Sequence, residues 1–392
     1  MGMIAIRETK WWLVIAAVIA LSASRAAAQQ YQPFGPVDIR TDMQLFAPVD
    51  LGDFGGGTPM AEGAFFSFEK LNWFLPATPT STLGTGSLVT AHPILASTIT
   101  DTSGVEVSYP EGGFGWGSRY EVGYVVDNDG WMVTILDGPE NTSETTFGDP
   151  DDGFDDIFVS FNDPFNLQTG FILIDDVPVA TSFPTTFDVL TIRTRTSVDG
   201  VELMKTHRFL PFHRGGVFEL YYGARYMKLT DVFDVATDDG GNMDASFWAT
   251  QAINYIIGPQ VGGQFVQKKG RWTLTMGGRA TAGYNIQQID QKGAINSSGL
   301  VRTAGNNSIG QNAFNHRARG EEISTLAELR ATWSFQITRS FAVNAGWTGV
   351  YASNIARASN VVNYTLPTMG ILPGDTEHFF TNGVNFGLEF NR

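Results

Sequence analysis

The sequence predicts an all-β protein: a transmembrane, antiparallel, up-and-down β-barrel of ten strands, with twelve strands as the alternative. Three observations favour this fold. Long segments alternate apolar and polar residues, the connections between them alternate between short and long, and the N-terminus is typical of an exported protein. Beyond that N-terminus no stretch reaches the ~18 consecutive apolar residues of a membrane helix, so helical spans are not expected.

The clearest alternating segment is 271–287. From Trp272 every second residue is apolar or glycine, and the residues between them are polar or glycine. Successive side chains of a strand point to opposite faces, so this segment has one apolar face and one wet face. At ~3.3 Å per residue and a tilt of ~45°, the span from Trp272 to Tyr284 rises roughly 28 Å. That height matches a lipid-facing band of ~25 Å between aromatic girdles.

Nine further segments complete the predicted wall. Pro259 cannot donate a hydrogen bond to a ladder, so we expect a bulge or a strand end near it. The segments are 65–74, 118–126, 130–137, 200–209, 216–229, 246–266, 321–337, 341–355 and 378–390.

The connections give the orientation. Short connections lie near 127–130, 210–215, 267–270 and 338–340, and long ones near 75–117, 138–199, 230–245, 288–320 and 356–377. Outer-membrane barrels have short periplasmic turns, long outer loops and an even number of strands. This order predicts ten strands with both chain ends on the periplasmic side. Strand-like runs at 154–161 and 187–197 allow an outer hairpin or two more wall strands.

The N-terminus predicts export to the bacterial outer membrane. Arg7 and Lys10 precede an apolar core, and Ala26 and Ala28 form a cleavage site. We therefore expect a signal peptide over residues 1–28 and a periplasmic lead-in over 29–60. The barrel would occupy 61–392, with long extracellular loops at 138–199 and 288–320.

Composition excludes several classes of function. The chain has no cysteine, which rules out disulfides, thiolate catalysis and cysteine zinc sites. Its 40 acidic and 25 basic residues give a formal net charge of −15, which argues against nucleic-acid binding. No cofactor and no metal site are predicted.

Charges of both signs occur on the wet faces of the predicted strands. Two interpretations remain open: the charges line a water-filled pore and set its selectivity, or they pair across a narrow interior and plug it. Ten or twelve strands lie nearer the width that side chains fill. The predicted lumen-lining residues are Arg119, Glu121, Glu219, Arg225, Arg271, Arg279, Glu328, Arg330 and Glu389.

The last strand carries a candidate insertion signal. Gly383, Phe386, Leu388 and Phe390 follow the pattern that barrel assembly machinery reads by strand addition. Such signals usually end on the aromatic residue, whereas Asn391 and Arg392 follow here. The expected partners are this machinery, membrane lipid and lipopolysaccharide.

Several short runs together resemble a known family, the putative β-barrel porin family common in planctomycetes, the seventh of the numbered barrel-porin families. The resemblance covers most of 62–392 and implies an outer-membrane barrel, porin function and no catalytic residues. The runs are Gly258-Pro259-Gln260-Val261-Gly262, Ala327-Glu328-Leu329 before Trp333, and Asn344-Ala345-Gly346-Trp347 before Val350-Tyr351.

The predicted function is a narrow, porin-like passive channel or a structural outer-membrane protein. A surface adhesin using acidic loops is the first alternative. A secreted soluble β-sandwich is the second, disfavoured because soluble strands rarely alternate over so many residues. Catalysis is not expected, because the five histidines show no catalytic arrangement and no Gly-x-Ser-x-Gly motif occurs.

Overall fold

The computed structural model describes residues 62–76, 112–147, 157–159, 169–174, 177–182, 185–187, 189–212, 216–237, 245–295, 312–365, 369–372 and 374–391. The chain divides into two units, Met1–Gln44 and Leu45–Arg392, and every described residue belongs to the second. The predicted signal peptide and the whole predicted lead-in, residues 29–60, lie outside the described residues.

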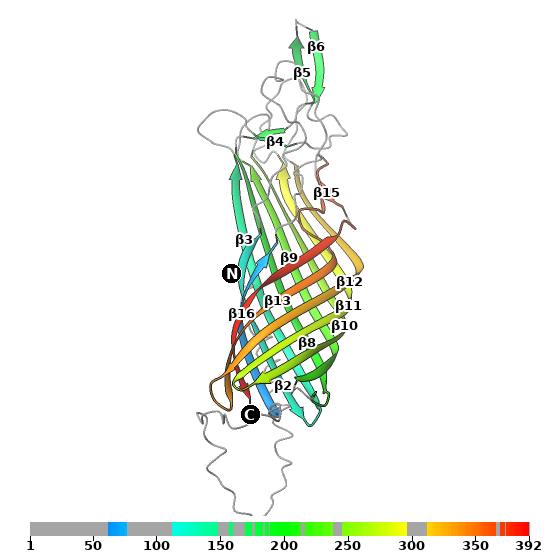
Figure 1. Cartoon of the computed structure of the whole chain (residues 1–392). Helices are drawn as coiled ribbons and strands as arrows, with labels where there is room; N and C mark the ends of the chain where they lie inside the picture. The colour runs from blue at the N-terminus through cyan, green and yellow to red at the C-terminus, as the bar shows by residue number, and fades with distance from the viewer. Residues whose placement is uncertain are drawn as a thin grey trace, which may run out of the picture. The chain divides into compact units, whose positions relative to one another are not determined.

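In the described part of the chain, ten strands close into one antiparallel barrel (Figure 1). The order around the wall is β1-β16-β13-β12-β11-β10-β9-β8-β3-β2, so β16 pairs with β1 at the closing seam. No helix among the described residues is long and apolar enough to cross a membrane. The wall strands are β1 (Gly63–Leu75), β2 (Gly113–Val126), β3 (Asp129–Phe147), β8 (Leu190–Arg208), β9 (Gly216–Thr237), β10 (Ser246–Lys269), β11 (Trp272–Ile295), β12 (Asn312–Gln336), β13 (Phe341–Ile355) and β16 (Glu377–Asn391).

The prediction of ten wall strands is confirmed, and the alternatives of twelve strands and of a soluble sandwich are wrong. The described part of the run at 154–161 is a short strand, residues 157–159, that lies outside the barrel sheet, and most of 187–197 belongs to one end of β8. The small pairs outside the barrel are β4 (Ile157–Val159) with β7 (Thr185–Phe187), β5 (Thr169–Ile174) with β6 (Val177–Ser182), and β14 (Val362–Asn363) with β15 (Gly370–Ile371).

The wall is tall on one side and short on the other. β3 and β8 to β12 have 19 to 25 residues, whereas β1, β2, β13 and β16 have 13 to 15. Figure 1 shows the tall strands rising past the ends of the short ones. The predicted outer loops 138–199 and 288–320 are therefore partly strand, since β3 runs to Phe147 and β11 to Ile295.

The expected bulge or strand end at Pro259 is wrong. β10 continues through Gly258 and Pro259, and its register with β11 is the same before and after them, with Ile257 opposite Tyr284 and Gln260 opposite Thr281. Proline removes one donor without changing the path of the strand. Gly258 allows the close approach here, because a Cβ on it would lie 2.0 Å from the Ala282 carbonyl oxygen.

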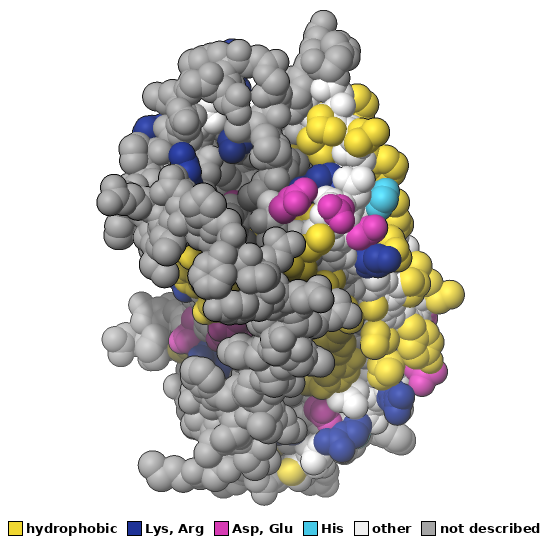
Figure 2. Space-filling model, turned by 90° about the horizontal axis from the view of Figure 1, so that it is seen from below, with side chains coloured by type: hydrophobic (Ala, Val, Ile, Leu, Met, Phe, Trp, Pro, Cys, Tyr) yellow, Lys and Arg dark blue, Asp and Glu magenta, His cyan; other side chains and the backbone are white. Residues whose placement is uncertain are grey.

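The outer wall carries the predicted apolar face. On β12, Trp333, Leu329 and Ile323 are exposed on one face, and Figure 2 shows hydrophobic side chains gathered along the uncovered wall. Further along the tall strands the alternation changes phase. On β9, Tyr222 and Tyr226 face outward, but beyond them the outward residues include Lys228 and Asp234, and most inward residues are apolar. This change indicates where the tall strands leave the lipid.

A charge in the middle of the apolar band should destabilise the barrel. Leu329 lies midway between Phe335 and Ile323 on the outer face of β12 and is 61% exposed. Leu329→Arg should lower the free energy of unfolding by about 2–4 kcal/mol, whereas Ile337→Arg, in the turn after β12, should cost about 0–1 kcal/mol. Urea unfolding in lipid vesicles measures both. Equal losses would contradict the assignment of this face to lipid.

Candidate functional site

The bore is crossed by charged side chains near the middle of the short strands. Four arginines and four glutamates from six strands converge there, and we call them the ionic layer. They come from β1, β2, β8, β9, β11 and β12, so the layer connects opposite walls of the barrel. Its members are Glu69, Arg119, Glu121, Glu202, Arg225, Arg279, Glu328 and Arg330.

Within the ionic layer each glutamate lies within ion-pair distance of two arginines. Glu328 lies 2.7 Å from Arg225 and 3.7 Å from Arg119. Glu202 lies 2.6 Å from Arg279 and 3.4 Å from Arg225. These five side chains therefore form the first half of a ring in which positive and negative charges alternate.

The remaining pairs close the ring. Glu69 lies 2.5 Å from Arg119 and 3.2 Å from Arg330. Glu121 lies 2.6 Å from Arg330 and 4.0 Å from Arg279. Because each charge has two neighbours of opposite sign, the ring is electrically balanced, which is how buried charges become tolerable.

The other four wall strands contribute neutral partners. Gln260 of β10 donates a hydrogen bond to Glu202 at 3.2 Å, and Thr134 of β3 donates to Glu121 at 3.5 Å. Arg119 donates to Thr348 of β13, which in turn donates to Asn385 of β16. Every wall strand thus supplies a polar group at this level, and the bore is filled rather than lined.

An apolar layer lies beyond the ionic layer, toward the tall end. Its side chains point inward from eight strands and are at most 7% exposed. These side chains form an apolar core inside the barrel, and buried polar residues such as Asn285 of β11 and Thr381 of β16 lie next to it. Its members are Leu71, Trp73, Leu75, Leu136, Val198, Met227, Leu229, Ile256, Leu326, Val350, Ala352, Ile355 and Phe379.

A segment after β13 covers the tall end of the bore. We call the described residues 356–365 and 369–372 the capping segment. Ala356 and Val361 pack with Trp248 of β10 and other inward residues of β8 to β12. Asn254 of β10 donates to the Ala356 carbonyl oxygen and accepts from its N–H, both at 2.9 Å.

One arginine fixes the capping segment across the bore. Arg357 is 1% exposed and lies 3.1 Å from Asp231 of β9 and 3.5 Å from Glu377 of β16. It also donates to the Pro76 carbonyl oxygen at 3.1 Å. Because β9 and the β1–β16 seam are far apart around the wall, this side chain bridges the outer mouth.

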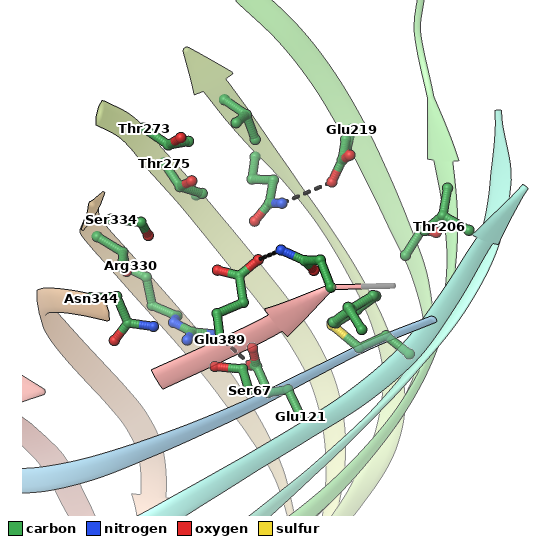
Figure 3. A pocket seen from close by; sticks show the side chains of 18 of the residues that line it. Ser67, Glu121, Thr206, Glu219, Thr273, Thr275, Arg330, Ser334, Asn344 and Glu389 are labelled. Carbon is green, nitrogen blue, oxygen red and sulfur yellow. Dashed lines mark hydrogen bonds and ion pairs between the residues drawn. The ribbon is translucent and has the colours of Figure 1, made fainter. Parts of the chain in front are cut away.

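On the other side of the ionic layer the bore opens into a polar cavity of about 250 Å³, the vestibule (Figure 3). Hydroxyl groups of Ser67, Thr273 and Thr275 line it, together with two further glutamates. Glu219 accepts from Arg208 and Gln264, both at 2.8 Å, and Glu389 accepts from Asn391 at 2.8 Å. The vestibule ends at the ionic layer, where Arg330 and Glu121 are the most exposed members.

Among the predicted lumen residues, six belong to the ionic layer, and Glu219 and Glu389 line the vestibule. Arg271 lies in the turn between β10 and β11, where its carbonyl oxygen accepts from the Gln336 N–H, and its place in the lumen stays a prediction. Sequence reasoning missed Glu69 and Glu202. Both lie on short segments that the sequence predicts as strands. Phe66 and Phe68 face outward, so the alternation along this strand places Glu69 on the inward face.

The candidate insertion signal lies on the closing strand. Phe386 and Leu388 are 54% and 45% exposed on the outer face of β16. Gly383 faces inward, where a Cβ would lie 2.1 Å from the Asn72 carbonyl oxygen of β1. The seam therefore requires glycine at this position, whatever reads the signal.

The closed antiparallel barrel with an apolar outer wall defines an outer-membrane β-barrel protein of the porin type. A family model described as Putative beta barrel porin-7 (BBP7) matches residues 159–391, more than half of the chain. The chain belongs to this family, as the sequence motifs predicted. No curated protein matches the chain.

Three solved structures illustrate the weaker likeness in fold. Outer membrane protease OmpT from Escherichia coli is 9% identical, with 86% of this chain and 98% of that chain covered and a TM-score of 0.38. A Pseudomonas aeruginosa FadL homologue is 9% identical, covers 85% and 90%, and has a TM-score of 0.23. The P. putida toluene transporter TodX is 10% identical, covers 84% and 90%, and has a TM-score of 0.16. These scores carry no functional argument.

Proposed function

We propose that this protein is a structural outer-membrane barrel with a closed bore, and not a permanently open channel. The observation that carries the proposal is the closed ring of the ionic layer, backed by the apolar layer and the capping segment. Water that enters the vestibule meets paired charges and then the apolar layer. A passive solute would have to displace both.

A gated narrow channel is the second candidate. It is favoured by the vestibule, which gives one half of the bore a polar lining, and by the capping segment, which is separate from the wall strands. In this candidate the family's porin function requires rearrangement of the interior. The adhesin alternative concerns outer loops that lie mostly outside the described residues.

Single-channel recording tests the proposal. The purified mature protein in planar bilayers should give no steady current in salts of several ion sizes, with insertion checked by protease protection in vesicles of the same lipid. A steady current from the unmodified protein would overturn the closed bore. Current that appears only above a threshold voltage would support the gated channel.

The remaining functional expectations are also proposals. The exposed apolar wall would contact membrane lipid and lipopolysaccharide, and β16 would engage the assembly machinery before it pairs with β1. We expect export through the N-terminal signal and no enzymatic activity. His207 lies 3.1 Å from Asp129 near a short turn, an arrangement typical of a surface ion pair.

A further inference from the structure

A row of polar side chains interrupts the apolar outer wall. The register places Lys70 of β1 opposite Ser118 of β2, and Ser118 opposite Asp137 of β3. Lys70 and Asp137 are exposed, on the outward faces of their strands. The row therefore crosses three adjacent strands with a positive charge at one end and a negative charge at the other.

Large apolar side chains lie on both sides of this row. On β2, Tyr120 and Trp116 flank Ser118 on the same face and are 38% and 59% exposed. Farther along, Phe114 forms an edge contact with Phe74 of β1, with ring centroids 5.6 Å apart. On β1 and β2 the row thus lies inside the apolar band, whereas on β3 it meets the polar part of the outer face, since Glu140 and Glu144 are exposed beyond Asp137.

Neither charge in the row has an ion-pair partner among the residues that the structure describes. Lys70 donates to the Ser118 hydroxyl at 3.3 Å, and no ion pair joins Lys70 or Asp137 to another described residue. Charges that face lipid are costly, and those found in membranes are nearly always paired or next to water. Lys70 therefore needs a negatively charged partner and Asp137 a positively charged one, and one partner surface with both charges would satisfy them.

A second copy of the same chain supplies that partner. When two barrels face each other across a two-fold axis along the membrane normal, β1 of one lies opposite β3 of the other, and β2 lies nearest the axis. Lys70 then faces the partner's Asp137, and the reverse pair forms on the other side of the axis. The flexible stem of lysine covers the offset between strands.

We propose that the outer face of β1, β2 and β3 is a self-association surface, on which Lys70 of each copy pairs with Asp137 of the partner subunit. Trp116 and Tyr120 supply apolar contact near the axis, and the small Ser118 lets the two walls approach. A copy of this chain fits better than an unrelated protein, because the two charges lie symmetrically about β2 and complement each other. The inference does not depend on whether the bore conducts.

Charge reversal followed by mixing tests the pairing. Lys70→Glu leaves two negative charges on the surface, and Asp137→Lys leaves two positive charges. Each variant alone should associate with itself at least about tenfold more weakly than the unmodified protein, because like charges meet across the axis. A mixture of the two variants should form a heterodimer, since both cross-axis pairs then have opposite sign. Native mass spectrometry in detergent measures all four samples.

Mixing separates the proposal from a role of the charges inside one chain. If the single variants are monomeric and the mixture stays monomeric, the charges act within one barrel and the proposal fails. It also fails if the single variants dimerise as well as the unmodified protein. Circular dichroism of each variant confirms that the barrel has folded.

Cross-linking in a bilayer gives an independent test. The chain has no cysteine, so Trp116→Cys introduces a single thiol near the proposed axis. Met276→Cys on β11, on the opposite wall, is the matched control, because the two side chains are 59% and 55% exposed. A short thiol cross-linker should join copies of the first variant and not of the second. Equal cross-linking, or none in either variant, would overturn the proposal.

Discussion

Glu328→Gln should lower the free energy of unfolding by about 3–5 kcal/mol, because it leaves buried arginine charge uncompensated. Glu328 lies between Arg225 and Arg119 in the ionic layer, and all three side chains are 3–4% exposed. The amide keeps the shape of the side chain and removes only its charge. The ring then holds one more positive than negative charge at a largely buried position. Urea unfolding of the protein in lipid vesicles, followed by tryptophan fluorescence, measures the loss.

Glu389→Gln is the matched control for this prediction. Glu389 also points into the bore, but it lines the vestibule and accepts a hydrogen bond from Asn391 rather than from an arginine. We expect the free energy of unfolding to fall by less than about 1 kcal/mol. No arginine pairs with this carboxylate, so the amide only replaces one hydrogen-bond acceptor with another. Similar losses in the two variants would show that the ring adds nothing beyond ordinary hydrogen bonding.

Most members of the ionic layer were predictable from alternation alone. A charge between outward apolar residues, such as Arg279 between Gly278 and Ala280, must face the bore if the strand faces lipid. The pairing was not predictable in the same way. Arg330 meets Glu69 and Glu121 across the bore, at 261 and 209 positions apart in the chain. Such contacts depend on the width and stagger of the closed barrel, which no single segment specifies.

The apolar layer escaped prediction for a different reason. The alternation of period two continues along β9, but its apolar face changes from outward at Tyr226 to inward at Met227 and Leu229. If one face is assigned to lipid over the whole strand, the apolar residues that point inward beyond Tyr226 are not predicted. Similarly, Asp231 and Arg357 fell in connections predicted as long loops, so their buried pair had no sequence signal.

Arg357→Met should release the capping segment while leaving the wall intact. The variant keeps much of the side-chain volume but leaves Asp231 as a buried carboxylate whose remaining partners are the Thr196 hydroxyl at 2.7 Å and the Ala358 N–H at 2.9 Å. Breaking such a pair costs about 3–5 kcal/mol. The capping segment can relieve this cost by leaving the bore, because it lies outside the ladder of wall strands. Hydrogen exchange should therefore rise in residues 356–365 and remain unchanged in β9 and β10.

The effect on current decides what the capping segment does. Arg317→Met is the control, since Arg317 is an arginine with an 82% exposed side chain that pairs with Asp290 on the outside of the tall wall. It should change neither hydrogen exchange nor current. If Arg357→Met loosens the capping segment and no current crosses the bilayer, the apolar and ionic layers are sufficient to close the bore, as a structural barrel requires. If current appears, the capping segment is the gate. Unchanged exchange in 356–365 would mean instead that apolar packing around Trp248 and Val361 holds the segment without its buried ion pair.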